Sequence, residues 1–99
     1  MNRKNNEVRV PAFRMLIGNI YEIRGLGPTV TGYIESGTVR VGDRLAVVRS
    51  DQRTEVYVTA IQRFQASLSE ASAADNPVGI SLSGIDRDEI HNRDLLVGG

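Results

Sequence analysis

The chain has 99 residues, of which 40% are hydrophobic and 24% are charged, and it contains no cysteine. This length and composition allow one packed domain with a modest core, and the lack of cysteine excludes disulfides, thiolate nucleophiles and thiolate zinc sites. The 12 basic and 12 acidic side chains cancel, so no overall charge would draw the protein onto nucleic acid or an anionic membrane.

Residues 1–10 are a polar lead-in that ends in a short β-type segment, Val8–Val10, which could form a first strand before Pro11. We expect a single domain over residues 11–99. The lead-in lacks the apolar core of a secretory signal, and no apolar run approaches the length of a membrane span. These features favour a cytoplasmic protein with no membrane partner.

The segment Phe13–Ile23 alternates apolar and polar residues, which is typical of a half-buried strand. Its period breaks at Gly18-Asn19, where we expect a bulge. After a glycine-rich turn, Thr29–Glu35 alternates again. Tight turns then separate two further predicted strands, Thr38–Val41 and Arg44–Arg49.

Thr54–Phe64 is expected to be a long strand that is partly apolar on both faces. The residues predicted to face one way are Val56, Val58 and Ala60, and those predicted to face the other are Tyr57, Thr59 and Ile61. The serine- and alanine-rich segment 65–74 is expected to be a surface connection with at most one helical turn.

The last third of the sequence predicts two more strands, Val78–Leu82 and Leu95–Val97, with a single helical turn between them at residues 86–90. Six or seven strands without a long helix, in a chain this short, predict an all-β fold. A small closed antiparallel β-barrel fits best, because closure removes the exposed edges of the sheet.

An ordered series of motifs resembles the second domain of the translational GTPases, the barrel that follows the nucleotide-binding domain in elongation factor Tu and its relatives. The motifs run in family order from about Phe13 to Val97: Gly25-x-Gly27, Thr29-Val30-Thr31-Gly32, Glu35-x-Gly37, Val41-Gly42-Asp43 and Val78-Gly79-Ile80-x-Leu82-x-Gly84-Ile85. The resemblance implies a barrel with Greek-key connections, here as a stand-alone domain. Since glycines build barrel corners whatever the function, it indicates architecture more than task.

In elongation factor Tu the corresponding barrel holds the aminoacylated 3′ end of tRNA. The resemblance implies that three features would serve this role: an acidic pair, a charged pair on a later strand and an asparagine before a Val-Gly pair. Here Gly18-Asn19 replaces the acidic pair, and Gln62 and Gln65 replace the charged pair. Pro77 also separates Asn76 from Val78. Binding of aminoacyl-tRNA therefore does not transfer to this chain.

We expect instead a non-catalytic module that contacts RNA or a protein of the translation apparatus through its polar face. An aromatic side chain beside an arginine can hold a single-stranded end by stacking. The candidate contact residues are Tyr21, Gln62, Arg63, Gln65 and Asn76.

Two other functions stay open at this point. The barrel could bind a separately encoded GTPase domain, or itself, without RNA, using the Thr54–Phe64 strand as the contact. It could also be a carrier that uses its terminal Gly98-Gly99. Carriers of the ubiquitin-like class need a long helix across a sheet, and the sequence has no such period.

Enzymatic chemistry finds no support in the sequence. The chain has no G-x-x-x-x-G-K-[ST] phosphate loop and a single lysine, Lys4, and Gly25-x-Gly27 lacks the third glycine of a dinucleotide site. The acidic cluster at 86–94, with His91, does not have the spacing of a calcium loop. We expect no catalytic residue, cofactor or metal site.

Overall fold

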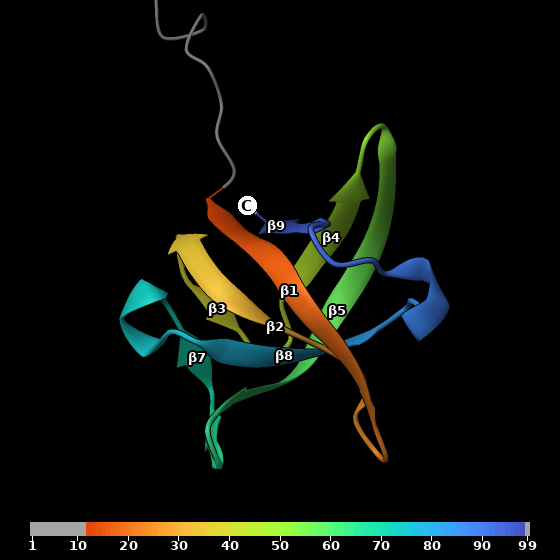
Figure 1. The fold of residues 1–99 in the computed structure, drawn as a ribbon. Coiled ribbons are helices and arrows are strands. Elements are labelled where there is room, and N and C mark those ends of the chain that lie inside the picture. Colours follow the sequence, from red (N-terminus) through yellow and green to blue (C-terminus); the bar gives the residue numbers. More distant parts are fainter. Residues whose placement is uncertain (1–11, 99) are drawn as a thin grey trace, which may run out of the picture.

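The computed structural model describes residues 12–98, which form nine strands and two short 3₁₀ helices (Figure 1). The strands are β1 (Phe13–Ile23), β2 (Gly27–Ser36), β3 (Val39–Arg40), β4 (Arg44–Arg49), β5 (Gln52–Arg63), β6 (Ala66–Leu68), β7 (Glu70–Ala71), β8 (Val78–Ser83) and β9 (Leu95–Gly98). The 3₁₀ helices are Ala73–Asp75 and Arg87–Glu89. The predicted lead-in 1–10, with its Val8–Val10 segment, lies outside the described residues.

Six strands close into an antiparallel barrel, which confirms the predicted fold. The hydrogen-bonded order is β4-β9-β1-β2-β8-β5, and the pairing of β4 with β5 completes the circle. β6 pairs only with β5, as the second strand of a hairpin, and β3 and β7 form a separate two-stranded sheet. The two C-terminal barrel strands are inserted between earlier ones, β9 between β4 and β1 and β8 between β2 and β5.

Alternating side chains of the barrel strands fill its interior. Five strands each contribute an apolar side chain with no exposed surface: Met15 (β1), Val30 (β2), Val56 (β5), Ile80 (β8) and Leu96 (β9). Burying each one contributes about 1.5–3 kcal/mol. Since the side-chain period of a strand is two residues, their immediate neighbours point outward. The outer face of the barrel is therefore where a binding site can form.

The irregularity predicted in β1 is confirmed. The pairing of β1 with β2 shifts register between Ile17 and Asn19. On its other side, Ile17 donates its N–H to the carbonyl of Asp94 at 2.9 Å and accepts the N–H of Arg93 at 2.7 Å. The bulge is therefore fixed to the loop before β9.

The predicted division of β5 into two partly apolar faces is wrong. The register with β8 shifts between Val58 and Ala60, and this extra residue turns Ile61 inward, where it is only 1% exposed. The outer face of β5 carries Glu55, Tyr57 and Thr59, all of them exposed. It therefore does not offer the apolar contact surface expected from the sequence.

The segment 65–74 is also more ordered than the expected surface connection, because it contains β6, β7 and the start of a 3₁₀ helix. These strands have only two or three residues, too few for a period to be visible in the sequence. Within residues 12–98, no helix is long and apolar enough to span a bilayer.

The turn after β2 requires glycine. Gly37 has a φ of 81°, and a Cβ there would collide with the carbonyl oxygen of Ala12. A side chain is thus excluded both by the left-handed backbone and by the adjacent start of β1. The Glu35-x-Gly37 motif consequently has a structural reason that is independent of any ligand.

Candidate functional site

Two of the predicted contact residues, Tyr21 and Gln62, meet in a shallow hollow of about 310 Å³ on the outside of the barrel. We call it the Tyr21 hollow. Its lining residues come from β1, β2, β5, the turn after β5, β8 and the residue before β8: Tyr21, Ile23, Thr29, Thr31, Gln62, Phe64, Pro77, Val78 and Gly79. In Figure 1 the β1–β2 hairpin and the turn that follows β5 both lie at the bottom of the view.

The hollow exists because a glycine stands in the middle of a row of paired residues. Asn19 pairs with Thr31, Thr31 with Gly79, and Gly79 with Gln62, across four neighbouring strands. A Cβ at Gly79 would lie 3.7 Å from the methyl carbons of both Thr29 and Thr31. A larger residue would fit without a backbone clash, but it would fill the space between Tyr21 and Gln62.

The floor of the hollow presents methyl groups because the hydroxyl of Thr29 is already used. Its Oγ1 lies 2.8 Å from Oγ of Ser81, and both residues are buried. The same hydroxyl donates to the carbonyl of Gly27 at 3.3 Å. Polar recognition in the hollow is therefore left mainly to the amide of Gln62, which can donate and accept.

Phe64 lines the Tyr21 hollow and was not among the contact residues expected from the sequence. It lies in the β5–β6 hairpin with a φ of 57°, and its side chain is 78% exposed. The sequence pattern predicts the end of a strand at Phe64, whereas the structure places it in a turn beside the hollow. A single aromatic residue between Arg63 and Gln65, at the start of a polar segment, was the available signal.

Arg63 and Gln65 do not line the hollow. Arg63 instead lies over the ring of Phe64, with Cζ 5.1 Å from the ring centroid, which is within the range of a cation–π contact. The Nε atom of Arg63 is buried and has no hydrogen-bond partner among the described residues. Gln65 is exposed in the turn. Arg63 therefore reaches the hollow only by way of Phe64.

Asn76 is engaged by the backbone rather than free for a ligand. Its Oδ1 accepts the N–H of Ile34 at 2.7 Å, and its Nδ2 donates to the carbonyl of Ile34 at 2.9 Å. The side-chain amide thus mimics one step of a β-ladder beside β2. It anchors Pro77, which follows through a cis peptide bond and lines the hollow.

A second hollow, of about 400 Å³, continues from the first along β2. We call it the Tyr33 hollow. It shares Thr31 and Pro77 with the Tyr21 hollow, and its other lining residues are Leu16, Gly18, Asn19, Gly32, Tyr33 and Glu35. Leu16 and Tyr33 are cross-strand partners, and they are 43% and 64% exposed. Leu16 and Tyr33 are the two residues of this lining that no sequence motif singled out.

Two larger hollows, of about 500 and 510 Å³, lie beside β4 and β5. Exposed charged side chains line both hollows. Arg44 and Glu55, which form an ion pair at 3.3 Å, line the first of them. Neither hollow has an aromatic side chain in its lining. They offer no counterpart to the combination of rings and amide found in the Tyr21 hollow.

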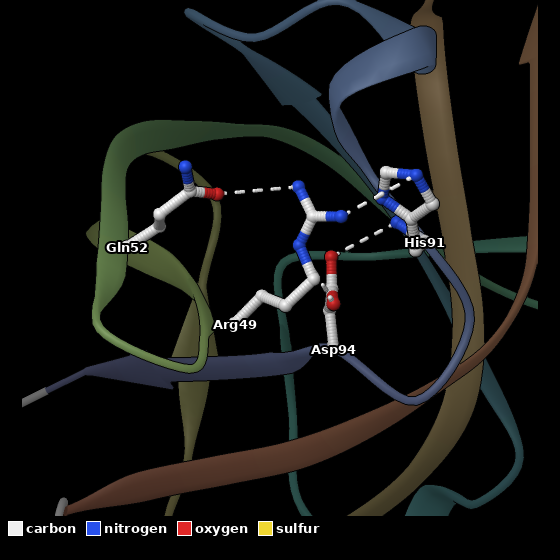
Figure 2. A network of polar contacts seen from close by, with 4 residues as sticks. All are labelled: Arg49, Gln52, His91 and Asp94. Atoms are coloured by element: carbon white, nitrogen blue, oxygen red, sulfur yellow. Dashed lines mark hydrogen bonds and ion pairs between the residues drawn. The ribbon is translucent and has the colours of Figure 1, made fainter.

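The acidic cluster near His91 stabilises the loop before β9. Asp94, which is 3% exposed, accepts the backbone N–H of His91 at 2.9 Å and lies 3.8 Å from Nε of Arg49. Figure 2 shows Arg49 at the centre of this network, with its other nitrogens directed at Gln52 and the ring of His91. Within residues 12–98, no three His, Asp or Glu side chains are placed to hold a metal ion.

A closed barrel with glycines at its turns is the architecture of a translation-factor β-barrel. Comparisons with known proteins assign the chain to a family. The family model of elongation factor Tu domain 2 matches residues 27–96, so the chain belongs to this family. Barrels of this family are non-catalytic domains of translation factors.

A solved structure supports the same assignment. The chain is similar to translation elongation factor SelB from Methanococcus maripaludis in its apo form, with 33% sequence identity and a TM-score of 0.77. The match covers 97% of this chain and 21% of the SelB chain. The chain therefore corresponds to about one fifth of that factor.

Proposed function

We propose that this chain is a non-catalytic, cytoplasmic binding module of the translation apparatus, and that its Tyr21 hollow holds an unstacked nucleotide at the end of a single-stranded RNA. The observation that carries the proposal is the meeting of Tyr21 and Gln62 across Gly79, beside the exposed ring of Phe64. Membership of the elongation factor Tu domain 2 family supports a role in translation.

The chemistry of the hollow suits a nucleobase. Aromatic side chains hold unpaired bases by stacking, which contributes about 1–3 kcal/mol per base. The Gln62 amide supplies one donor and one acceptor group for the edge of a base, and the threonine methyl groups supply apolar contact. Arg63, held over Phe64, would offer a cation for the adjoining phosphate.

The ligand need not be an aminoacylated tRNA. Gly18-Asn19 stands where elongation factor Tu has its acidic pair, and the amide of Asn76 is bound to Ile34. What remains for recognition is a hollow whose lining has no charged side chain and carries the polar groups of Tyr21, Thr31 and Gln62. This favours RNA that is recognised by stacking rather than through a charged amino acid ester.

Binding to short single-stranded RNAs tests the proposal. We expect Tyr21→Ala and Gln62→Ala to weaken binding, and Tyr57→Ala to serve as the matched control, since Tyr57 is exposed on β5 away from the hollow. Arg63→Ala should reduce the salt dependence by about one phosphate contact. RNA binding that is absent, or equal in all four variants, would contradict the proposal.

A second candidate function is protein interaction without RNA, with a separate GTPase domain or a second copy of the chain. The exposed Leu16 and Tyr33 favour it, since apolar side chains that cluster on a surface mark protein contacts. Self-association or partner capture that is insensitive to salt and to nuclease would support this function. Retention of RNA by the purified chain would count against it.

A further inference from the structure

We infer that the free edge of β1 binds an extended, acidic peptide segment of a protein partner, which adds to the sheet as one more strand. The edge consists of residues 18–23, and we call it the β1 edge. The inference goes beyond the proposed function, because it uses the backbone on the side of β1 that faces away from β2, whereas the Tyr21 hollow uses side chains.

The β1 edge exists because β1 is longer than the strand beside it. β9 pairs only with Phe13–Leu16, and Figure 1 shows it beside the upper part of β1 alone. Ile17 is then bonded through its N–H and its carbonyl to the loop before β9. From Gly18 to Glu22, no backbone group of residues 12–98 bonds to this side of β1. This half of β1 is therefore an edge strand.

The orientation of the free backbone groups follows from one contact. The carbonyl of Ile20 accepts a guanidinium N–H of Arg87 at 3.4 Å, so it faces away from β2. The register with β2 is regular from Asn19 to Ile23, and alternate residues direct their N–H and C=O groups to the same side. Glu22 therefore faces the same side as Ile20. Together they offer two N–H donors and two carbonyl acceptors.

This arrangement of donors and acceptors suits a peptide. An extended peptide binds an exposed sheet edge through its own alternating N–H and C=O groups. A nucleic acid strand has no matching ladder of backbone donors and acceptors. The backbone of the β1 edge thus favours a protein partner over RNA.

Exposed arginines lie along the whole β1 edge. The backbone N–H of Arg93 binds the carbonyl of Ile17 at one end, and Arg24 follows the last residue of β1 at the other. Arg87 lies between them, at Ile20. Within the part of the chain that the structure describes, none of the three arginines forms an ion pair. An acidic strand would be complementary to them, whereas a second copy of the chain would bring the same arginines together.

The acidic residues next to Arg87 are engaged elsewhere. Asp86 and Glu89 cap the 3₁₀ helix reciprocally, and the carboxylate of Glu89 accepts the N–H of Asp86 at 2.9 Å. Asp88 lines the hollow that also contains Arg53, beside β5. Glu22 is the one acidic residue in the β1 edge itself. Substitution of Glu22 can therefore separate the contribution of charge from that of the backbone.

A synthetic peptide of about eight alternating glutamate and valine residues, with blocked ends, tests the inference. It is titrated into the full chain, and amide NMR signals are recorded. We expect the N–H groups of Ile20 and Glu22 to shift and to exchange more slowly with solvent, and Gly79 in the Tyr21 hollow to stay unchanged. The same peptide with lysine in place of glutamate should not bind. Methylation of every backbone nitrogen keeps the charge of the acidic peptide but should abolish its binding.

Glu22→Pro is the decisive variant, with Glu22→Ala as its matched control. Proline removes the N–H that faces the edge and places a ring against the incoming strand, while the hydrogen bonds between β1 and β2 are kept. We expect Glu22→Pro to weaken binding of the acidic peptide at least about 10-fold. Glu22→Ala should bind it at least as tightly as the wild type, because a like charge is lost. The NMR spectra of both variants verify the fold.

The contribution of charge has its own pair of variants. Arg24→Ala should weaken binding of the acidic peptide by about 1.5-fold to 5-fold, the range for one exposed ion pair. Arg40→Ala should have no effect, since Arg40 pairs with Glu70 at 3.0 Å in the separate β3–β7 sheet. Equal binding by both variants would contradict an acidic partner at this edge.

The other possible outcomes are also decisive. Normal binding by Glu22→Pro, equal binding of the lysine peptide, or no binding of the acidic peptide overturns the inference. Slow exchange of the Ile20 and Glu22 N–H groups in the free chain would show that the edge is already covered, and dependence of that exchange on protein concentration would identify a second copy. An oligonucleotide that displaces the peptide would assign the edge to RNA. RNA in the Tyr21 hollow is detected separately, at Gly79, so the two proposals can fail independently.

Discussion

Asn76 makes two hydrogen bonds to the backbone of Ile34, one through each polar atom of its side-chain amide. The two residues are 42 positions apart in the sequence. The contact extends the edge of β2 where no strand is present, and it fixes the entry of the chain into β8. A residue expected to contact a ligand is thus bound to the backbone, next to Pro77 in the wall of the Tyr21 hollow.

Asn76→Ala should lower the free energy of unfolding by about 2–3 kcal/mol, because it removes two hydrogen bonds and leaves the partly buried N–H and C=O of Ile34 unpaired. Unfolding in urea measures the change. Gln65→Ala is the control, because Gln65 was also a predicted contact residue but lies exposed in a turn. Its free energy of unfolding should stay within about 0.5 kcal/mol of the wild-type value. Equal stability of both variants would contradict the anchoring role.

Much of the barrel could be predicted because its signals are local. The alternation of Phe13–Ile23 and its break at Gly18-Asn19 predict both β1 and its bulge. Arg44–Arg49 was likewise bounded correctly by its turns. Ile61 was assigned to the wrong face because a bulge between Val58 and Ala60 reverses the alternation, and that bulge is set by pairing with β8, not by the sequence of β5.

The site was harder to predict, because it depends on neighbours that are distant in the sequence. Tyr21 and Gln62 were found through a family resemblance, and both line the same hollow. Phe64 and Tyr33 gave no such signal, since an aromatic residue on a strand is usually read as core. Their exposure depends on a hairpin turn for Phe64 and on the outward register of β2 for Tyr33.

Gly79 of the Tyr21 hollow and Gly32 of the Tyr33 hollow should respond differently to substitution by alanine. Gly79→Ala should keep the fold, because the added methyl meets only ordinary contacts at 3.7 Å. It should weaken nucleotide binding by about 10-fold, which corresponds to about 1.4 kcal/mol of lost contact. Thermal unfolding and oligonucleotide titration of the same samples measure the two effects.

Gly32→Ala should instead destabilise the protein by about 3 kcal/mol, the upper range for overpacking. A Cβ at Gly32 would collide with the carbonyl oxygen of Leu16, which belongs to the backbone of β1 and cannot move aside. Thermal unfolding measures the loss. If Gly32→Ala melts at the temperature of Gly79→Ala, the close approach of β1 and β2 at this point is wrong.

Asp94→Ala should destabilise the fold by about 2–3 kcal/mol, because the buried carboxylate holds the N–H of His91 and faces Arg49. The loop it fixes is bonded to Ile17, next to the bulge that borders the Tyr33 hollow. Gln52→Ala, at the exposed end of the same network, should have less than about 0.5 kcal/mol of effect. Urea unfolding of both variants compares them directly.

Phe64 should separate binding from stability most clearly. Its positive φ of 57° is unfavourable for any residue but glycine, and its exposed ring contributes little to the core. Phe64→Gly should therefore match or exceed the wild-type stability, and it should be about 1 kcal/mol more stable than Phe64→Ala, which keeps the strained backbone.

Both variants should lose nucleotide binding to the same degree, because both remove the ring on which Arg63 and a base would stack. Unfolding in urea and oligonucleotide titration give the two readings. If both variants are clearly less stable than the wild type, the ring supports the hairpin rather than a ligand.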